Sequence, residues 1–351
     1  MPETFSTEPI ANFGGNLQLK PQSVFVPQNE GEVLEILARV RGRKIRTIGR
    51  LHSWSEAPQT DDVLIDVRNL NEVRIQKRND EPFATIGAGS QIKRVLSELE
   101  RQADLTLPSL GLITEQTIAG ATATGTHGSG KNSLSHYLEE VRVATYDPET
   151  GEPVIRVISN GDELRAARCS LGCLGVIVSV GLRPRPQYNV EEHFYKYRNI
   201  DDVLTAEDSF PLQQFFFIPW MWKYFAQHRR EAPTSRSLRA GLYRAYFFCT
   251  FDIAFHLVLL MLTRLFRSRS LVRFFYRVVM PLTVIRGWRV IDRSSDQLTV
   301  EHELFRHIEI EVFVTKSKLR EALAFVEELL RLAGGQEDAI SPAMRERLES
   351  H

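Results

Sequence analysis

Two spacings of apolar residues alternate along the chain and predict a mixed fold of strands and helices. Short apolar runs bounded by turn residues predict strands, whereas apolar positions three and four apart predict amphipathic helices. The first such unit is a strand over residues 23–27, a helix over residues 29–42 and a strand over residues 44–48. Asn29 is placed to cap the helix, whose apolar positions are Val33, Ile36, Leu37 and Val40.

The same reasoning predicts the remaining elements and the division of the chain. Further strands are expected over residues 63–67, 73–76, 83–90, 140–146, 154–159, 175–182, 192–197, 214–218 and 307–314, and further helices over residues 91–102 and 317–332. The turn DPETG joins two of the strands as a hairpin. Pro184 and Pro186 interrupt regular structure. We therefore expect one domain over residues 1–187 and a second over residues 188–351.

A stretch rich in glycine, alanine and threonine, residues 108–130, does not fit either spacing. It reads PSLGLITEQTIAGATATGTHGSG. Glycine and alanine leave the main chain uncovered, so that a flat ligand or an anion can approach the backbone closely. The alternative is a loop in which the glycines only make turns.

Three segments in chain order resemble one family of flavoproteins. Residues 44–53, KIRTIGRLHS, match the turn R-x-x-G-x-x-H-S through Arg46, Gly49, His52 and Ser53. Residues 117–130 resemble TAGA-x-x-TGTHG-[ST]-G, with Ile118 at an alanine-like position, and residues 170–184 read SLGCLGVIVSVGLRP. Together they resemble the PCMH-type FAD-binding domain of the vanillyl-alcohol-oxidase family, in its branch of sugar-lactone and alditol oxidases.

The resemblance implies an α+β fold in which a two-subdomain FAD-binding domain precedes a partial α+β substrate, or cap, domain. It implies that FAD is the cofactor and that His52 bonds it covalently. The residues implied to bind FAD are Ile48, Gly49, Arg50, Leu51, His52, Ser53, Ser109, Thr117, Gly120, Ala121, Thr124, Gly125, Thr126, His127, Gly128, Gly175, Val176 and Ile177.

Two other nucleotide-binding motifs match incompletely. Residues 125–132, GTHGSGKN, approach the phosphate-binding pattern G-x-x-x-x-G-K-[ST], but Asn132 stands where a magnesium-binding hydroxyl is required. Gly87 and Gly89 form half of a dinucleotide fingerprint, but Ile92 replaces its third glycine. Neither a nucleoside triphosphatase nor an NAD-binding protein is therefore favoured.

The implied activity is hydride transfer from a hydroxyl-bearing carbon of a sugar, sugar lactone or alditol to the flavin, with oxygen or another acceptor taking the electrons. The family's late motifs, E-x-R and H-W-G-K, do not follow the helix expected to end at Leu332. Glu311 falls on an acidic motif position of the second domain, although a charged residue on such a strand is more often solvated. The sequence thus assigns no catalytic residue. The alternative function is a flavin-binding protein or partner subunit without turnover of its own.

Composition argues against nucleic acid as a partner and favours a reducing compartment. Forty-four basic and forty-four acidic residues cancel, which gives no overall field for nucleic acid. The three cysteines have no metal-binding spacing and favour a reduced, cytoplasmic setting. No metal is expected. The first residues lack the basic and apolar regions of a secretory signal.

Residues 242–277 combine a long apolar stretch with flanking arginines. The stretch LYRAYFFCTFDIAFHLVLLMLT is interrupted by Arg244, Asp252 and His256, and this argues against a helix that spans a membrane. Two interpretations remain open: an interfacial helix on a membrane surface, or a buried helix with basic surface residues. The first predicts a peripheral contact with the inner face of the membrane.

Overall fold

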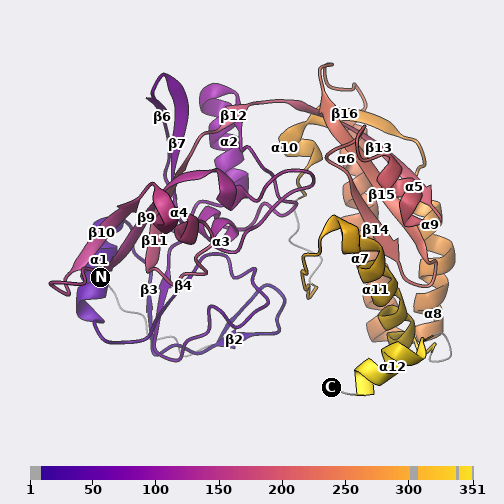
Figure 1. Ribbon diagram of the computed structural model, residues 1–351, viewed down its shortest axis with the longest axis horizontal. Coiled ribbons are helices and arrows are strands. Elements are labelled where there is room, and N and C mark those ends of the chain that lie inside the picture. Colours follow the sequence, from indigo (N-terminus) through magenta and orange to yellow (C-terminus); the bar gives the residue numbers. More distant parts are fainter. Residues whose placement is uncertain (1–8, 301–306, 337–339, 350–351) are drawn as a thin grey trace. The chain divides into compact units, whose positions relative to one another are not determined.

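The computed structural model describes residues 9–300, 307–336 and 340–349. It combines helices and strands, which confirms the α+β class (Figure 1). Two compact units divide the chain: Met1–Tyr188 with Arg293–Glu309, and Asn189–Asp292 with Ile310–His351. The second unit is thus interrupted by a segment that belongs to the first.

The first unit begins with the predicted strand, helix and strand. These are β3 (Ser23–Phe25), α1 (Glu30–Arg39) and β4 (Ile45–Ile48), and with β5 (Val63–Asp66) they form a parallel sheet in the order β3-β5-β4. The Asn29 side chain caps α1 by accepting a hydrogen bond from the Glu32 N–H at 3.0 Å. The loop that follows β4 contains His52.

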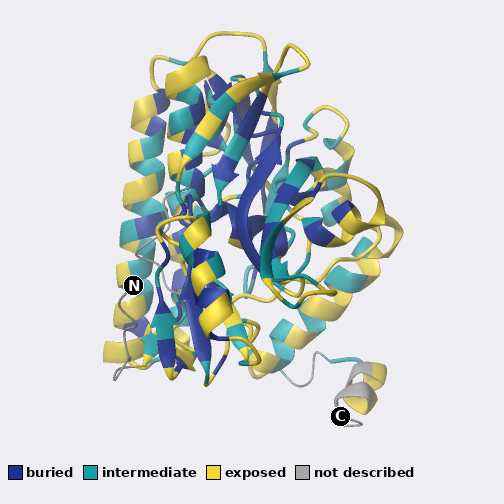
Figure 2. Ribbon diagram, turned by 90° about the vertical axis from the view of Figure 1, so that its left-hand side faces the viewer, coloured by how far each residue is buried: buried dark blue, intermediate teal, exposed yellow. Residues whose placement is uncertain are grey.

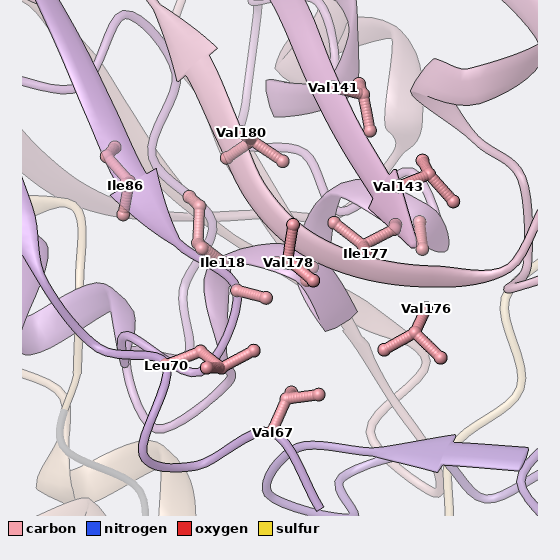
Figure 3. Packing of buried hydrophobic residues seen from close by; sticks show 14 of the residues in the cluster. Val67, Leu70, Ile86, Ile118, Val141, Val143, Val176, Ile177, Val178 and Val180 are labelled. Carbon is pink, nitrogen blue, oxygen red and sulfur yellow. The ribbon is translucent and has the colours of Figure 1, made fainter. Parts of the chain in front are cut away.

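An antiparallel sheet of five strands forms the larger part of the first unit. Its strands, in the order β10-β9-β11-β7-β6, are β6 (Val73–Arg78), β7 (Glu81–Gly87), β9 (Leu138–Tyr146), β10 (Pro153–Ile158) and β11 (Val176–Leu182). All residues of β11 are buried. Its valines pack with Ile86, Ile118 and Val143 in one apolar core (Figure 3). The expected hairpin of β9 and β10 is confirmed.

Short elements complete the first unit. They are β1 (Ile10–Ala11), β2 (Gln18–Leu19), α2 (Ile92–Ala103), β8 (Leu105–Thr106), α3 (Ile118–Ala123), η1 (Leu134–Tyr137), α4 (Gly161–Arg168), β12 (Arg185–Pro186) and α10 (Ser294–Gln297). The helix expected over residues 91–102 is confirmed, but its cap residue is Gln91 rather than Ser90, and no side-chain hydrogen bond caps it. Part of the Gly/Thr stretch, for which neither apolar spacing predicted a regular element, forms α3.

The second unit is built on a sheet in the order β14-β15-β13-β16. Its elements are β13 (Asn189–Tyr197), α5 (Ile200–Thr205), β14 (Gln214–Ile218), β15 (Lys223–Ala232), β16 (Arg289–Arg293), η5 (Lys316–Lys318), α11 (Leu319–Ala333) and α12 (Pro342–Glu349). Glu192 and Arg229 face each other across β13 and β15 and form a buried ion pair at 2.5 Å. The Tyr243 hydroxyl also donates to Glu192.

Two further helices in the second unit form what we call the helical hairpin, residues 240–283. The first consists of α6 (Ala240–Phe247), a π-helical segment (Phe248–Ala254), α7 (Phe255–Leu260) and a second π-helical segment (Met261–Leu265). The second consists of α8 (Arg269–Phe274), a π-helical segment (Phe275–Val279) and α9 (Met280–Thr283). Exposed residues gather on helices and loops, and the strands carry many of the buried ones (Figure 2).

The first helix of the hairpin is long and apolar enough to cross a membrane by length and composition alone. Only 6% of its most apolar 18 residues are buried. The helix is therefore not a fully buried core helix, and the expectation that its charged residues argue against a spanning helix is wrong as far as length and composition go.

The strand expected over residues 307–314 is absent. These residues have no regular secondary structure, and Ile310 and Phe313 are 89% and 74% exposed. An alternating pattern gives a strand only where a neighbouring strand accepts its hydrogen bonds, and no described strand pairs with this segment. Glu309 and Glu311 accordingly lie on exposed chain.

Candidate cofactor site

The turn that follows β4 contains the first group of residues along the chain that are predicted to bind FAD. Leu51 has a φ of 56°, a left-handed conformation that is unusual for a residue with a side chain. Such strain persists only where the surrounding structure enforces it, and it is common at functional sites. His52, the residue implied to bond FAD, follows directly.

Two residues near the N-terminus hold this turn. The Phe13 N–H donates to the Leu51 carbonyl at 2.8 Å, and the Asn12 amide donates to the Ser53 carbonyl at 2.9 Å. The Phe13 ring stacks on the His52 ring, with centroids 4.5 Å apart and 22° between the planes. His52 is therefore bracketed by hydrogen bonds on both sides and its ring is covered on one face.

The segment Arg293–Glu309, which returns to the first unit, also reaches the turn. The Trp54 ring N–H donates to the His307 carbonyl at 2.7 Å, and the two rings lie 5.4 Å apart. The His307 ring stands edge-on to Phe13 at 6.4 Å. No sequence motif indicated the roles of Asn12, Phe13 or His307, because these contacts join segments far apart in the chain.

The second predicted segment folds back on itself around α3. The Thr117 side chain caps α3 by accepting from the Gly120 N–H at 3.3 Å, and the Thr126 N–H donates to the Ala121 carbonyl at 2.9 Å. A Cβ added at Gly128 would lie 3.0 Å from the Leu110 carbonyl carbon and closer still to its oxygen. Only glycine permits this approach of the two chains.

The third segment lies beside the other two. The Leu171 N–H donates to the Ala123 carbonyl at 3.1 Å. A Cβ at Gly125 would be in ordinary contact with the Cys169 sulfur, and a Cβ at Gly49 would clash with Thr117. The structure thus brings the three predicted segments together in one unit.

The predicted residues differ in exposure. Those buried behind the surface are Ile48, Ser109, Thr117, Ala121, Val176 and Ile177. Those exposed or partly exposed are Gly49, Arg50, Leu51, His52, Ser53, Gly120, Thr124, Gly125, Thr126, His127, Gly128 and Gly175. The accessible set consists mainly of glycines, small hydroxyl residues and two histidines, and this composition fits a flat ligand with an anionic group. The buried set can contribute only by supporting these loops.

A second polar cluster lies in the other unit, on the sheet face of β13 and β15, where His193 and His228 are directly opposite. His228 bonds the Tyr197 hydroxyl through Nε2 at 2.8 Å and the Gln213 side-chain oxygen through Nδ1 at 3.0 Å. Burial, with a smaller contribution from His193, lowers the pKa of His228. A neutral imidazole matches this environment, accepting from Tyr197 and donating to Gln213.

Glu191 stands next to this cluster and is held as a carboxylate. Burial raises its pKa, but hydrogen bonds from Arg289, His193 and Arg230 outweigh burial and lower the pKa to about 2. Motif matching missed this cluster. Its only sequence signal is the alternation of polar and aromatic residues in EEHFYKY.

Comparison with known proteins agrees with the first two segments, which lie within the matched residues. Residues 21–151 match the family described as an FAD binding domain. A long-chain alcohol oxidase from an uncultured marine euryarchaeote is 54% identical over 338 residues, which are 96% of this chain and 70% of that protein.

Two relatives whose names give a lactone as substrate are less similar in sequence than the long-chain alcohol oxidase. The L-gulono-1,4-lactone dehydrogenase of Mycobacterium tuberculosis is 30% identical over 63% of this chain, and the chain spans only 52% of it. The L-gulonolactone oxidase of Mus musculus is 24% identical over 91% of this chain and 72% of that protein.

Solved structures support the fold. A cholesterol oxidase from B. sterolicum superposes with a TM-score of 0.68 over 87% of this chain and 63% of that one, at 15% identity. A solvent-stable cholesterol oxidase gives 0.69 over 97% of this chain and 71% of that one, at 16% identity. With the matched domain, the 54% identical relative and the converging flavin segments, the chain belongs to the family of FAD-binding, PCMH-type oxidases.

Proposed function

We propose that this chain binds FAD and oxidises the CH–OH group of a primary alcohol that carries a long apolar chain. The observation that carries the proposal is the 54% identity, over almost the whole chain, to a long-chain alcohol oxidase. Sugar lactones and alditols are the second candidate class, because the lactone-acting relatives match the chain at lower identity.

The proposed cofactor contacts follow from exposure. The backbones of Gly49, Gly120, Gly125 and Gly128 offer accessible N–H and carbonyl groups to the cofactor, and the buried residues of the predicted set hold these loops from behind. Arg50 is exposed beside the first turn and supplies positive charge for a pyrophosphate.

His52 is the proposed point of covalent attachment. Bound FAD would supply the group that accepts a hydride from the alcohol carbon. The protein's part is to present a neutral imidazole in one orientation, and the Phe13 stack together with the hydrogen bonds from Asn12 and Phe13 restricts that orientation.

No residue is assigned a catalytic role. The competing proposal is that the chain holds flavin without turnover of its own, since neither E-x-R nor H-W-G-K follows Leu332 in this sequence. We propose a cytoplasmic location, in keeping with three free cysteines that are all exposed.

The test uses the purified chain. Its absorption spectrum is recorded before and after acid precipitation, and the bound flavin is then mixed without oxygen with 1-dodecanol, an aldonolactone or an alditol. We expect yellow precipitate and faster bleaching by dodecanol than by the other two. A colourless purified protein would overturn the site, bleaching by the lactone alone would reverse the substrate class, and no bleaching by any compound would favour the protein without turnover.

A further inference from the structure

The helical hairpin leaves many large apolar side chains on the surface. The exposed ones are Leu242, Phe248, Leu257, Leu260, Met261, Leu265, Phe266, Leu271, Phe274, Val278, Val279 and Leu282. Soluble monomers rarely expose so many large apolar residues on adjoining elements, and such a surface usually marks an interaction site.

Helical spacing shows that these side chains have their own face. In the first helix, Leu257, Met261 and Leu265 are four residues apart and exposed, whereas Phe255, Val258 and Leu262 pack in a core cluster with Phe194 and Phe225 of the sheet. Residues three and four apart lie on one side of a helix. The helix therefore has a packed face toward the sheet and an apolar open face.

The second helix repeats this arrangement. Leu271, Phe274, Val278 and Leu282 are exposed at intervals of three and four residues. Val272, Phe275, Tyr276 and Met280 pack in the same core cluster. Both helices are thus held in the domain by one side, and each leaves an apolar stripe open.

The hairpin is strongly basic in a chain of zero net charge. Residues 240–283 contain six arginines and one acidic residue, Asp252, which gives 6 − 1 = +5 with histidine neutral. In the part of the chain that the structure describes, no carboxylate forms an ion pair with Arg264, Arg267, Arg269 or Arg277. These guanidinium groups are exposed and available to an external anion.

The charge and the apolar residues coincide at the turn between the two helices. Leu265 and Phe266 are 72% and 52% exposed, and Arg264, Arg267 and Arg269 surround them in the sequence. Apolar side chains enter the acyl region of a bilayer, while adjacent arginines bind lipid phosphates.

We propose that the hairpin docks on the surface of an anionic phospholipid bilayer, with its turn and open faces inserted and its packed faces retained on the sheet. A second copy of the chain is a less suitable occupant, because a symmetric contact would bring the exposed arginines of two hairpins together. A spanning helix would have to withdraw Phe255 and Leu262 from the core cluster.

Flotation of the full chain tests this directly, with vesicles of phosphatidylcholine alone and of phosphatidylcholine containing about 30% phosphatidylglycerol, an anionic surface of the kind that attracts basic segments. We expect recovery with the anionic vesicles, weaker recovery with the neutral ones and release by alkaline carbonate. Two variants separate the contribution of the arginines from that of the apolar side chains. R267Q/R269Q should weaken binding to anionic vesicles about 25-fold, because each arginine contributes about fivefold. L265S/F266S should weaken binding to anionic and neutral vesicles alike.

A matched control removes two charges elsewhere on the same unit. Lys196 and Arg198 are exposed and lie outside the hairpin, so K196Q/R198Q should bind like the wild type. Far-ultraviolet circular dichroism must show that all variants are folded. Equal binding by R267Q/R269Q and K196Q/R198Q, carbonate-resistant insertion, or a dimer that L265S/F266S dissociates without any vesicle binding would each overturn the proposal.

Discussion

The close approach of the first two flavin segments can be tested with one added methyl group. A Cβ built at Gly49 would lie 2.7 Å from Thr117 Cγ2 and 3.0 Å from Thr117 Cβ, and closer still to the hydroxyl oxygen. Thr117 is 2% exposed and caps α3, so it cannot turn away without losing that hydrogen bond. Overpacking of this kind costs about 1–3 kcal/mol. We therefore expect Gly49→Ala to lower the melting temperature by about 2–12 °C, at about 2–4 °C per kcal/mol.

The partner substitution turns this into a double-mutant cycle. Thr117→Ala alone should cost about 1 kcal/mol through the lost cap, but the double variant lacks the methyl and hydroxyl groups that the new Cβ at position 49 would strike. The double variant should be more stable than the sum of the single effects predicts by about 1 kcal/mol or more. Unfolding in urea, followed by flavin fluorescence, measures the difference.

The matched control is Gly241→Ala, where an added Cβ meets no atom within 4 Å. That glycine lies in α6, so the change should be neutral or stabilising by up to about 1 kcal/mol. Effects of Gly49→Ala and Thr117→Ala that add within about 0.5 kcal/mol would refute the contact between the two segments.

Three further predictions concern single side chains. His52→Ala should leave acid-precipitated protein colourless if the wild-type precipitate is yellow, and retained colour would exclude His52 as the attachment point. The pKa of Glu191 is about 2 in the folded protein and 4.5 in the unfolded chain, so its contribution to the free energy of unfolding is present above pH 4.5 and is lost as the pH falls toward 2. Glu191→Gln should therefore flatten that part of an acid-unfolding curve. An unchanged curve would contradict the hydrogen-bond network around Glu191. Arg229→Met should destabilise the protein by about 3–5 kcal/mol in urea unfolding, because it leaves the Glu192 carboxylate buried without its cationic partner, whereas a loss below about 1 kcal/mol would contradict this.

Elements whose signals are local were predictable from the sequence. The Asn29 cap and the apolar positions of α1 lie within one segment, and the structure has the helix as expected. The sequence indicated three segments for the candidate site, and the structure brings them together in the first unit. That they bind FAD at the named residues stays a prediction. The hydrogen bond from the Asn12 amide to the Ser53 carbonyl, which supports the His52 turn, was not predictable, because it joins residues 41 positions apart. The strand expected over residues 307–314 failed for a related reason, since alternation specifies a face but not a partner.

The hydrogen bond between Trp54 and His307 also constrains the order in which the protein can mature. Its donor and acceptor are 253 residues apart in the chain, and synthesis proceeds from the N-terminus at about 5–20 residues per second. The ribosome must therefore make the sheet and the helical hairpin of the second unit before the last support of the His52 turn emerges. For at least about ten seconds after Trp54 is made, the turn has only Asn12 and Phe13 to hold it. Full ordering of the His52 turn is consequently a late event, which follows synthesis of the sheet and the helical hairpin of the second unit.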